Sequence, residues 1–349
     1  MVNLYSDTQT RPTPEMREAI ARAEVGDEQR RADPTVVALE ERVAALLGHE
    51  AAVFLPSGTM CNEIAIRLHI RPGGDEILLG RETHPLRFEG GAPAAVSGAL
   101  MTIVEGEAGR FAPEALDAAI REHPPGDRYA PRPRLVCVEQ PTNMGGGRVW
   151  PLEQVRAVLD VARSHGLRTH LDGARLMNAV VASGVDAATW AGGFDTAWLD
   201  FTKGLGAPVG ACLAGSADLI AEAWRWKQML GGAMRQSGII AAAGLYALDH
   251  HVERLADDHA RARRLAEGLA AMPGVEIDPA TVETNILVFA VPDAPAFCAA
   301  LAEAGVMMIA LDRRRVRAVT HLDVDDDGIE EALAAADRAL RASERASAA

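Results

Sequence analysis

The sequence predicts an α/β protein in which a mostly parallel central sheet carries helices on both faces, followed by a small α+β C-terminal domain. Short apolar runs typical of buried strands alternate with helical apolar spacing along most of the chain. The 349 residues suffice for one large core and a smaller second one. We therefore expect a large domain over residues 1–249, including a polar N-terminal arm, and a small domain over residues 250–349.

The expected elements of the large domain begin after the arm. Residues 34–48 show helical apolar spacing that ends at a glycine, and an apolar run at 51–55 follows. Later β-type runs read "EILLG", "LMTIVEG", "RLVCVE", "LRTHLDG", "TAWLDF" and "VGACLAG". Helical patterns separate several of these runs, among them residues 113–123 and 151–166. Strands that are joined through helices predict parallel neighbours in one sheet.

The C-terminal part predicts a second and smaller unit. The pattern is helical from residue 237 to about 272, and a mixed set of short segments follows. These segments read "NILVFAV", "APAFCAALAEAG", "VMMIAL", "RRVRAVTHL" and "DGIEEALAAADRALRA". Because β-type runs and helical patterns are interspersed here, we expect an α+β arrangement.

Composition limits the classes of partner. A net charge of -14 repels nucleic acid and anionic membranes unless basic residues cluster, and no run of them does. The start is unlike a signal peptide, and no apolar stretch approaches the roughly 18 residues of a membrane span. The four cysteines lack the paired spacing of a zinc site. We expect a cytoplasmic protein with a small-molecule substrate, no nucleic-acid or membrane partner, and no metal.

The loops after the strands are where this fold class places its chemistry. Ser57, Gly58 and Thr59 follow the run at 51–55, and a helical pattern starts behind them. Glycine lets a ligand approach the backbone, and a helix N-terminus presents unpaired N–H groups to an anion. These residues predict a phosphate-binding turn, although a plain Ser/Thr helix cap has the same pattern.

Asp172 is a carboxylate that comes directly after a hydrophobic β-type run. A buried carboxylate needs a partner, and Arg175, three residues later, is one candidate for a structural salt bridge. In the alternative, Asp172 meets a protonated ring nitrogen of a ligand. Arg175 is then left to bind a substrate carboxylate through its two-point fork.

Lys203 is one of only two lysines among 35 basic residues, and it follows "TAWLDF" within the glycine-rich "TKGLGAPVG". Unlike arginine, a lysine can lose its proton and attack a carbonyl carbon to form a Schiff base. The other lysine, Lys227, lies in an amphipathic helical pattern, where we expect a surface or interface position. Lys203 is therefore the candidate nucleophile.

A phosphate-binding turn, an acid and a Schiff-base lysine, each at a strand end and in this order, are what pyridoxal phosphate requires. At these residues the chain resembles the threonine aldolases of the β-eliminating lyase group, which are fold-type I pyridoxal-phosphate enzymes. The matching segments extend from the sixth residue to the last quarter of the chain. They read "SDTQTRPTPEM", "DPTV", "PSGTMCN", "THPLRFEGG", "HLDGARLMNA", "TKGLGAPVG", "LGGAMRQSG" and "RAVTHLDV".

The resemblance implies a role for each residue of the cofactor site. Lys203 corresponds to the Schiff-base lysine, and Asp172 to the acid that keeps the pyridine nitrogen protonated. Gly58 and Thr59, beside Ser57, correspond to the phosphate anchors. A bound cofactor would thus be held at three separate points.

The resemblance also implies the residues that surround the cofactor. His84 takes the place of the histidine that stacks on the ring, and Arg235 is expected to reach the phosphate of a neighbouring subunit. Ser6, Arg175 and Arg317 resemble the groups that bind the α-carboxylate of the substrate, and Arg175 also counts among the cofactor-binding residues.

The implied activity is that of a pyridoxal-phosphate-dependent carbon–carbon lyase, which cleaves the Cα–Cβ bond of a β-hydroxy-α-amino acid to glycine and an aldehyde. His84, or a water that it orders, would accept the β-hydroxyl proton. Alternatives are β-elimination, transaldolase chemistry or transamination, a cofactor-free lysine aldolase, and a non-catalytic protein that binds the cofactor. Because fold-type I sites are completed by a second subunit, we expect a homodimer or homotetramer.

Two positions depart from the family pattern. "EQPTNMGG" places Thr142 where these enzymes usually carry a histidine, and "QRRADPTV" has Arg30 and Arg31 near the positions of a tyrosine and a glycine. Extra positive charge at the mouth of the pocket would change the preferred aldehyde side chain. The substrate stays open among threonine, allo-threonine, phenylserine and similar compounds, as does the stereochemistry at Cβ.

Overall fold

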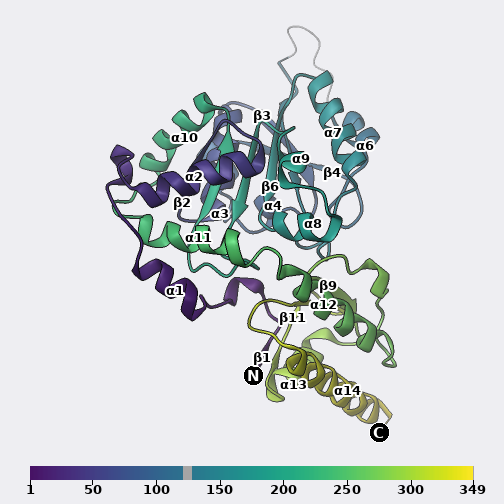
Figure 1. The fold of residues 1–349 in the computed structure, drawn as a ribbon. Coiled ribbons are helices and arrows are strands. Elements are labelled where there is room, and N and C mark those ends of the chain that lie inside the picture. The colour runs from purple at the N-terminus through teal and green to yellow at the C-terminus, as the bar shows by residue number, and fades with distance from the viewer. Residues whose placement is uncertain (121–127, 349) are drawn as a thin grey trace.

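The computed structural model describes residues 1–120 and 128–348 and is built around a seven-stranded sheet (Figure 1). Its strand order is β2-β8-β7-β6-β5-β3-β4. The strands are β2 (Ala51–Leu55), β3 (Asp75–Gly80), β4 (Leu100–Val104), β5 (Arg132–Glu139), β6 (Arg168–Gly173), β7 (Thr196–Asp200) and β8 (Ala211–Gly215). Strand β8 is antiparallel to both neighbours, and the other pairings are parallel. The predicted mostly parallel sheet is therefore confirmed.

Helices cover both faces of this sheet because successive apolar side chains of a strand point to opposite faces, so both faces are apolar. In β2, Val53 and Leu55 belong to the core beneath α3, whereas Ala52 and Phe54 belong to the core on the opposite face. The first face carries α3 (Gly58–His69), α4 (His84–Arg87), α5 (Ala92–Ser97) and α10 (Ala217–Met229). The second carries α1 (Pro14–Ala21), α2 (Pro34–Leu47), α6 (Pro113–Ala119), α7 (Leu152–Ser164), α8 (Leu176–Ser183), α9 (Ala187–Ala191) and α11 (Gly238–His250).

The helix boundaries follow local signals in the sequence. The Asp33 side chain caps α2 by accepting from the N–H of Val36, and the helix ends at Gly48 with φ 71°, as its glycine predicts. The pattern predicted over 113–123 forms α6, and its residues 121–123 lie outside the described residues. Among the described residues, no helix combines the length and hydrophobicity of a membrane span.

The smaller unit has its own sheet and core, which Figure 1 shows below the large sheet beside the yellow α14. Its three-stranded antiparallel sheet has the order β11-β12-β9, and a short parallel pair joins β1 to β10. The strands are β1 (Val2–Asn3), β9 (Ile286–Ala290), β10 (Val306–Met307), β11 (Ile309–Ala310) and β12 (Arg315–Val319). The helices are α12 (Leu255–Ala270), α13 (Ala294–Glu303) and α14 (Asp326–Ala348).

The N-terminal arm connects the two units. Val2 and Leu4 are buried in the core of the smaller unit, and the chain then enters a 3₁₀ turn, η1 (Asp7–Gln9). Two further 3₁₀ turns are η2 (Glu28–Arg30) and η3 (Pro279–Thr281). This path places Ser6 and Asp7 beside the ends of the central strands. The division at residue 250 stays a prediction.

Candidate active site

A cavity of about 620 Å³ lies at the carboxyl edge of the central sheet. Residues of the arm, the large unit and β12 line it. It brings together five of the ten site residues predicted from the sequence, together with Asn143: Ser6, His84, Arg175, Lys203 and Arg317. This location follows from the strand order, because β7, β6, β5 and β3 are consecutive neighbours whose following loops meet at one edge.

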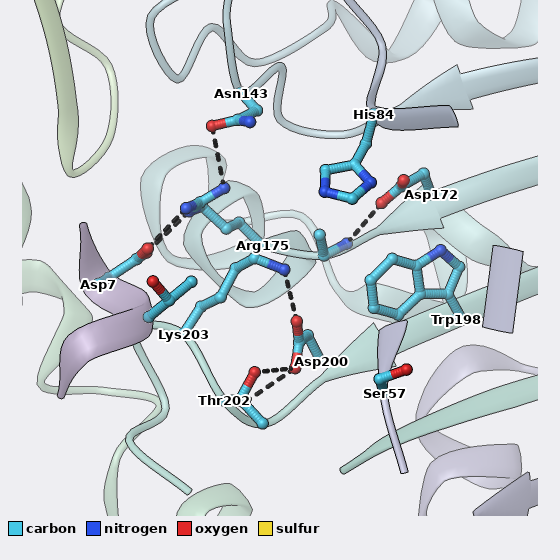
Figure 2. Close-up of polar contacts among 12 residues, drawn as sticks. Asp7, Ser57, His84, Asn143, Asp172, Arg175, Trp198, Asp200, Thr202 and Lys203 are labelled. Carbon is cyan, nitrogen blue, oxygen red and sulfur yellow. Dashed lines mark hydrogen bonds and ion pairs between the residues drawn. The ribbon is translucent and has the colours of Figure 1, made fainter. Parts of the chain in front are cut away.

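Lys203 follows β7 and is held by the end of that strand. Its Nζ lies 2.5 Å from Oδ2 of Asp200, and Oδ1 of Asp200 accepts from the backbone N–H and the hydroxyl of Thr202 (Figure 2). The amine also lies 5.5 Å from the ring centre of Trp198. Asp200 thus fixes the lysine head group at the wall of the cavity, with 14% of the side chain exposed.

The turn after β2 fits an anion. Ser57 caps α3 by accepting from the N–H of Met60 at 3.3 Å, and the first-turn N–H groups of Gly58 and Thr59 have no partner within the helix. A Cβ on Gly58 would lie 2.2 Å from the ring of Trp198, so only glycine fits. The first turn of α3 therefore packs directly against the indole that faces Lys203.

Asp172 is buried on β6 without an ion pair among the residues the structure describes. Its Oδ2 accepts from Nδ2 of Asn62 at 2.8 Å, and its Oδ1 accepts from the N–H of Ala174 at 3.1 Å. Burial raises the pKa of Asp172, and nearby His84 and Lys203 offset this only in part. A protonated ring nitrogen of a ligand would supply the missing cation.

Arg175 does not pair with Asp172, so the salt bridge considered from the sequence is not formed. Its Nε and Nη2 donate instead to the two carboxylate oxygens of Asp7, at 2.7 and 2.6 Å (Figure 2). Burial alone would raise the pKa of Asp7, but the Arg175 guanidinium holds it below its usual range. Nη1 remains directed toward Oδ1 of Asn143, at 3.4 Å.

Arg317 meets Arg175 at the same acceptor. Its Nη2 donates to Oδ1 of Asn143 at 2.8 Å, while its Nε has no partner among the described residues. Burial lowers the pKa of Arg317 to about 10, with Arg175 as a further cause. Arg175 is thus paired with the buried Asp7, whereas Arg317 forms no ion pair among the described residues, so its guanidinium suits a carboxylate ligand.

His84 begins α4 above the same cavity. Its Nδ1 lies 2.8 Å from Oε1 of Glu89, and its backbone N–H donates to Oε2 of Glu139 at 2.8 Å. Burial acts to lower the pKa of His84, but the contact with Glu89 and the nearby Asp172 outweigh it, so the pKa is raised. Nδ1 is thus engaged, which leaves Nε2 for a ligand.

Several positions singled out in the sequence lie away from the cavity lining. Arg235 is exposed, with Nη1 3.3 Å from Oδ2 of Asp27. Arg31 is exposed near Glu40. Thr142 is buried, although its neighbour Asn143 lines the cavity.

The prediction for Lys227 was wrong, because this side chain is fully buried. Its Nζ lies 2.9 Å from Oε1 of Glu28 and 4.2 Å from the ring centre of Trp224. Oε2 of Glu28 accepts from the hydroxyl of Ser237. The ion pair therefore joins η2 to α10, and the bond from Ser237 joins Glu28 to the end of the loop that carries Arg235.

Sequence reasoning missed five residues of the site: Asp7, Asn62, Glu89, Asn143 and Asp200. Two of them had a signal in the sequence, since Asp7 follows Ser6 directly and Asp200 precedes Lys203 by three residues. Asn62 and Glu89 lay within segments that carried the family resemblance. Their roles depend on contacts between distant segments, which no local pattern reports.

Comparison with known proteins gives a consistent result. Residues 3–292 match the family model of the β-eliminating lyases. The chain is 41% identical over 336 residues to a probable low-specificity L-threonine aldolase 2 of Arabidopsis thaliana, covering 94% of each chain. It is 39% identical to the low specificity L-threonine aldolase of Escherichia coli K12, covering 96% of this chain and 98% of the relative. The fold matches a threonine aldolase structure from Leishmania major with a TM-score of 0.83 at 20% identity, covering 97% and 100% of the two chains.

Proposed function

Because the chain belongs to the β-eliminating lyase family, we propose that it is a carbon–carbon lyase of the threonine aldolase type. It cleaves the Cα–Cβ bond of a β-hydroxy-α-amino acid and releases glycine and an aldehyde. The observation that carries this proposal is the cavity itself. There the amine of Lys203 and the guanidinium groups of Arg175 and Arg317 line the same space, with the acid Asp172 close by.

Pyridoxal phosphate is the cofactor, and when bound it supplies an aldehyde for a covalent bond and a ring that accepts electrons. Lys203 would hold its aldehyde carbon, and Asp172 would keep its ring nitrogen protonated. The N-terminal N–H groups of α3, at Gly58 and Thr59, would take the phosphate. The fit is supported by the first-turn N–H groups of α3 that have no partner within the helix, and by the buried carboxylate of Asp172, whose pKa is raised by burial.

The substrate is held by its α-carboxylate. Ser6, Arg175 and Arg317 would bind this group, because all three line the cavity and Arg317 has no ion pair among the described residues. Fixing the carboxylate decides which bond at Cα is aligned for cleavage. His84 would then accept the β-hydroxyl proton at Nε2, since Glu89 already occupies Nδ1.

The side-chain end of the cavity suits more than one substrate. Tyr5, Phe88 and Met144 line it together with the polar residues, and Phe88 is half exposed. Apolar walls accept a methyl group or a phenyl ring with modest discrimination. We therefore expect L-threonine, L-allo-threonine and phenylserine all to be cleaved, in keeping with the low specificity named for the relatives.

The reaction type is tested by the products formed from threonine. We expect the purified protein with pyridoxal phosphate to release acetaldehyde and glycine in equal amounts. β-Elimination would instead give ammonia and a keto acid, and transamination would give a keto acid without ammonia. Parallel assays for acetaldehyde, ammonia and keto acid separate these reactions, and a keto acid as the main product would contradict the proposal.

The assembly is proposed to be a homodimer or homotetramer in the cytoplasm. Arg235 is exposed on a glycine-rich loop that the buried Glu28–Lys227 pair fastens in place. An arginine held outside its own cavity is well placed to complete the site of a second subunit. Its role would be to contact the phosphate of the cofactor bound there.

Replacing Arg235 by alanine is expected to weaken pyridoxal phosphate binding by about 10- to 100-fold, the range for a lost charge-assisted hydrogen bond of about 1.5–3 kcal/mol. Equilibrium dialysis gives the dissociation constant, and light scattering gives the assembly size. Arg22→Ala is the matched control, because Arg22 is also exposed and pairs only with Glu18. A fully active monomer, or equal affinities in both variants, would rule out the shared site.

A further inference from the structure

Two buried carboxyl groups face each other behind His84. Glu63 on α3 and Glu89, which follows α4, are 4% and 5% exposed. Both Oε atoms of Glu63 and Oε2 of Glu89 lack a hydrogen-bond donor in the described part of the chain. Their side chains are close enough for a hydrogen bond to each other. Two adjacent buried carboxylates with no donor between them would repel strongly, which favours one proton between Glu63 and Glu89.

The surroundings decide which of the two carries the charge. Oε1 of Glu89 accepts from Nδ2 of Asn62 at 2.6 Å and contacts Nδ1 of His84 at 2.8 Å. Glu63 has no such donor in the described structure. The negative charge therefore resides on Glu89, and Glu63 is the protonated partner that donates. Consistently, burial followed by the contact with Glu89 raises the pKa of Glu63 to about 9.

The orientation of Asn62 strengthens this assignment. Its Oδ1 accepts from the indole N–H of Trp198 at 2.7 Å, and an indole nitrogen can only donate. The two N–H bonds of Nδ2 must therefore point to Glu89 and to Asp172. Asn62 thus bridges the acid that holds His84 and the acid that faces the ring nitrogen of the cofactor.

The charged groups around His84 come from four elements. Besides Glu89, they are Asp172 on β6, Lys203 after β7 and Glu139 on β5. Among the nearby groups that stay neutral, burial lowers the pKa of His170 to about 3 and raises the pKa values of the Cys61 and Cys137 thiols. Of these groups, only Glu63 lies on the far side of Glu89 and acts on His84 through it.

We propose that Glu63 is a positioning residue that donates a proton to Glu89 and thereby limits the basicity of His84. With that donor in place, the Glu89 carboxylate is a weaker acceptor for Nδ1–H. His84 can then release its proton near neutral pH and accept a proton at Nε2. The inference rests on the proposed function only in taking His84 as that acceptor.

Substitution of Glu63 tests the inference through the pKa of His84. Glu63→Leu removes the donor, so Glu89 becomes the stronger acceptor and the pKa of His84 rises by about one unit. Glu63→Gln keeps a neutral donor of the same size, so the pKa stays within about 0.3 units of the parent value. Histidine-selective NMR titration of the holoenzyme measures the pKa of His84. The signal of His84 is assigned as the one that is lost in the His84→Asn variant.

The pattern across the two variants decides the outcome. If Glu63 were ionised, both substitutions would remove a negative charge, and the pKa of His84 would fall in each; that result overturns the inference. Unchanged values in both variants overturn it as well. If Glu63→Leu does not fold, Glu63→Met takes its place, because methionine also lacks a donor. The acid limb of the pH profile of kcat for threonine should shift by the same amount as the pKa of His84 measured by NMR. The NMR titration tests the effect of Glu63 on His84 even if threonine is not the substrate, so the two failures can be told apart.

Discussion

Replacement of Lys203 by alanine is expected to lower the rate of aldehyde release from β-hydroxy amino acids by about 10³-fold or more. Among the described residues that line the cavity, Lys203 is the only one with an amine that can lose a proton and bond to an aldehyde, since the arginines there carry guanidinium groups. The near-visible absorbance of the lysine-bound cofactor should disappear together with activity. Both are measured on protein saturated with pyridoxal phosphate.

Lys203→Arg is the matched variant for this experiment. It keeps a positive charge beside Asp200 but cannot act as a nucleophile. We expect it to be as inactive as Lys203→Ala, with thermal stability closer to that of the parent because the pairing with Asp200 survives. An alanine variant that turns over at the parental rate would remove the basis of the proposed chemistry, and an active arginine variant would make the lysine an electrostatic group only.

Much of the cofactor side of the site could be predicted because it depends on strand ends. Apolar runs locate the ends of β2, β6 and β7, and the polar residues that follow at Ser57, Asp172 and Lys203 must then meet at one edge of a parallel sheet. The fold class and the family resemblance drawn from the same residues are confirmed by the model and by the comparisons. Local pattern and overall fold agree here.

The antiparallel direction of β8 could not be predicted from its apolar residues alone. Only residues 201–210 connect β7 to β8, and a parallel connection needs a crossover of a dozen or more residues. The chain therefore turns back, and β8 pairs with β7 in antiparallel fashion. Apolar content marks a strand as buried, but the length of its connection sets its direction.

The substrate side was harder to predict because its contacts join distant segments. Asp7 and Arg175 are 168 residues apart, and they meet only because β1 of the arm pairs with β10 of the smaller unit. Lys227 was misplaced for a similar reason, since amphipathic spacing does not reveal that Glu28 enters the core opposite it. A buried charge finds its partner through tertiary structure, which a single sequence does not display.

Asp7→Asn is expected to lower the free energy of unfolding by about 3–5 kcal/mol, the range for a buried pair that loses one partner. The change preserves the size of the side chain but removes its negative charge. The guanidinium of Arg175 then faces either an amide NH₂, which is also a donor, or an uncharged oxygen. Arg175, which is only 5% exposed, then loses its buried counterion, and the nearby Arg317 loses the attraction of the same charge. Urea denaturation of the cofactor-loaded protein, with and without a small carboxylate such as acetate, measures the loss.

The matched control is Asp249→Asn, which breaks the exposed pair with Arg42 and should lower the free energy of unfolding by under about 1 kcal/mol.

The difference in unfolding free energy between the parent and Asp7→Asn should also depend on pH. Because the pKa of Asp7 is depressed in the folded protein, its contribution is fully present above about pH 4, the unfolded value, and is lost as pH falls toward the folded one. Parent and variant should therefore converge in strong acid. Added carboxylate should stabilise the variant more than the parent, because it replaces the missing countercharge. Equal costs for both substitutions at neutral pH would show that Asp7 is not the counterion that stabilises the buried Arg175.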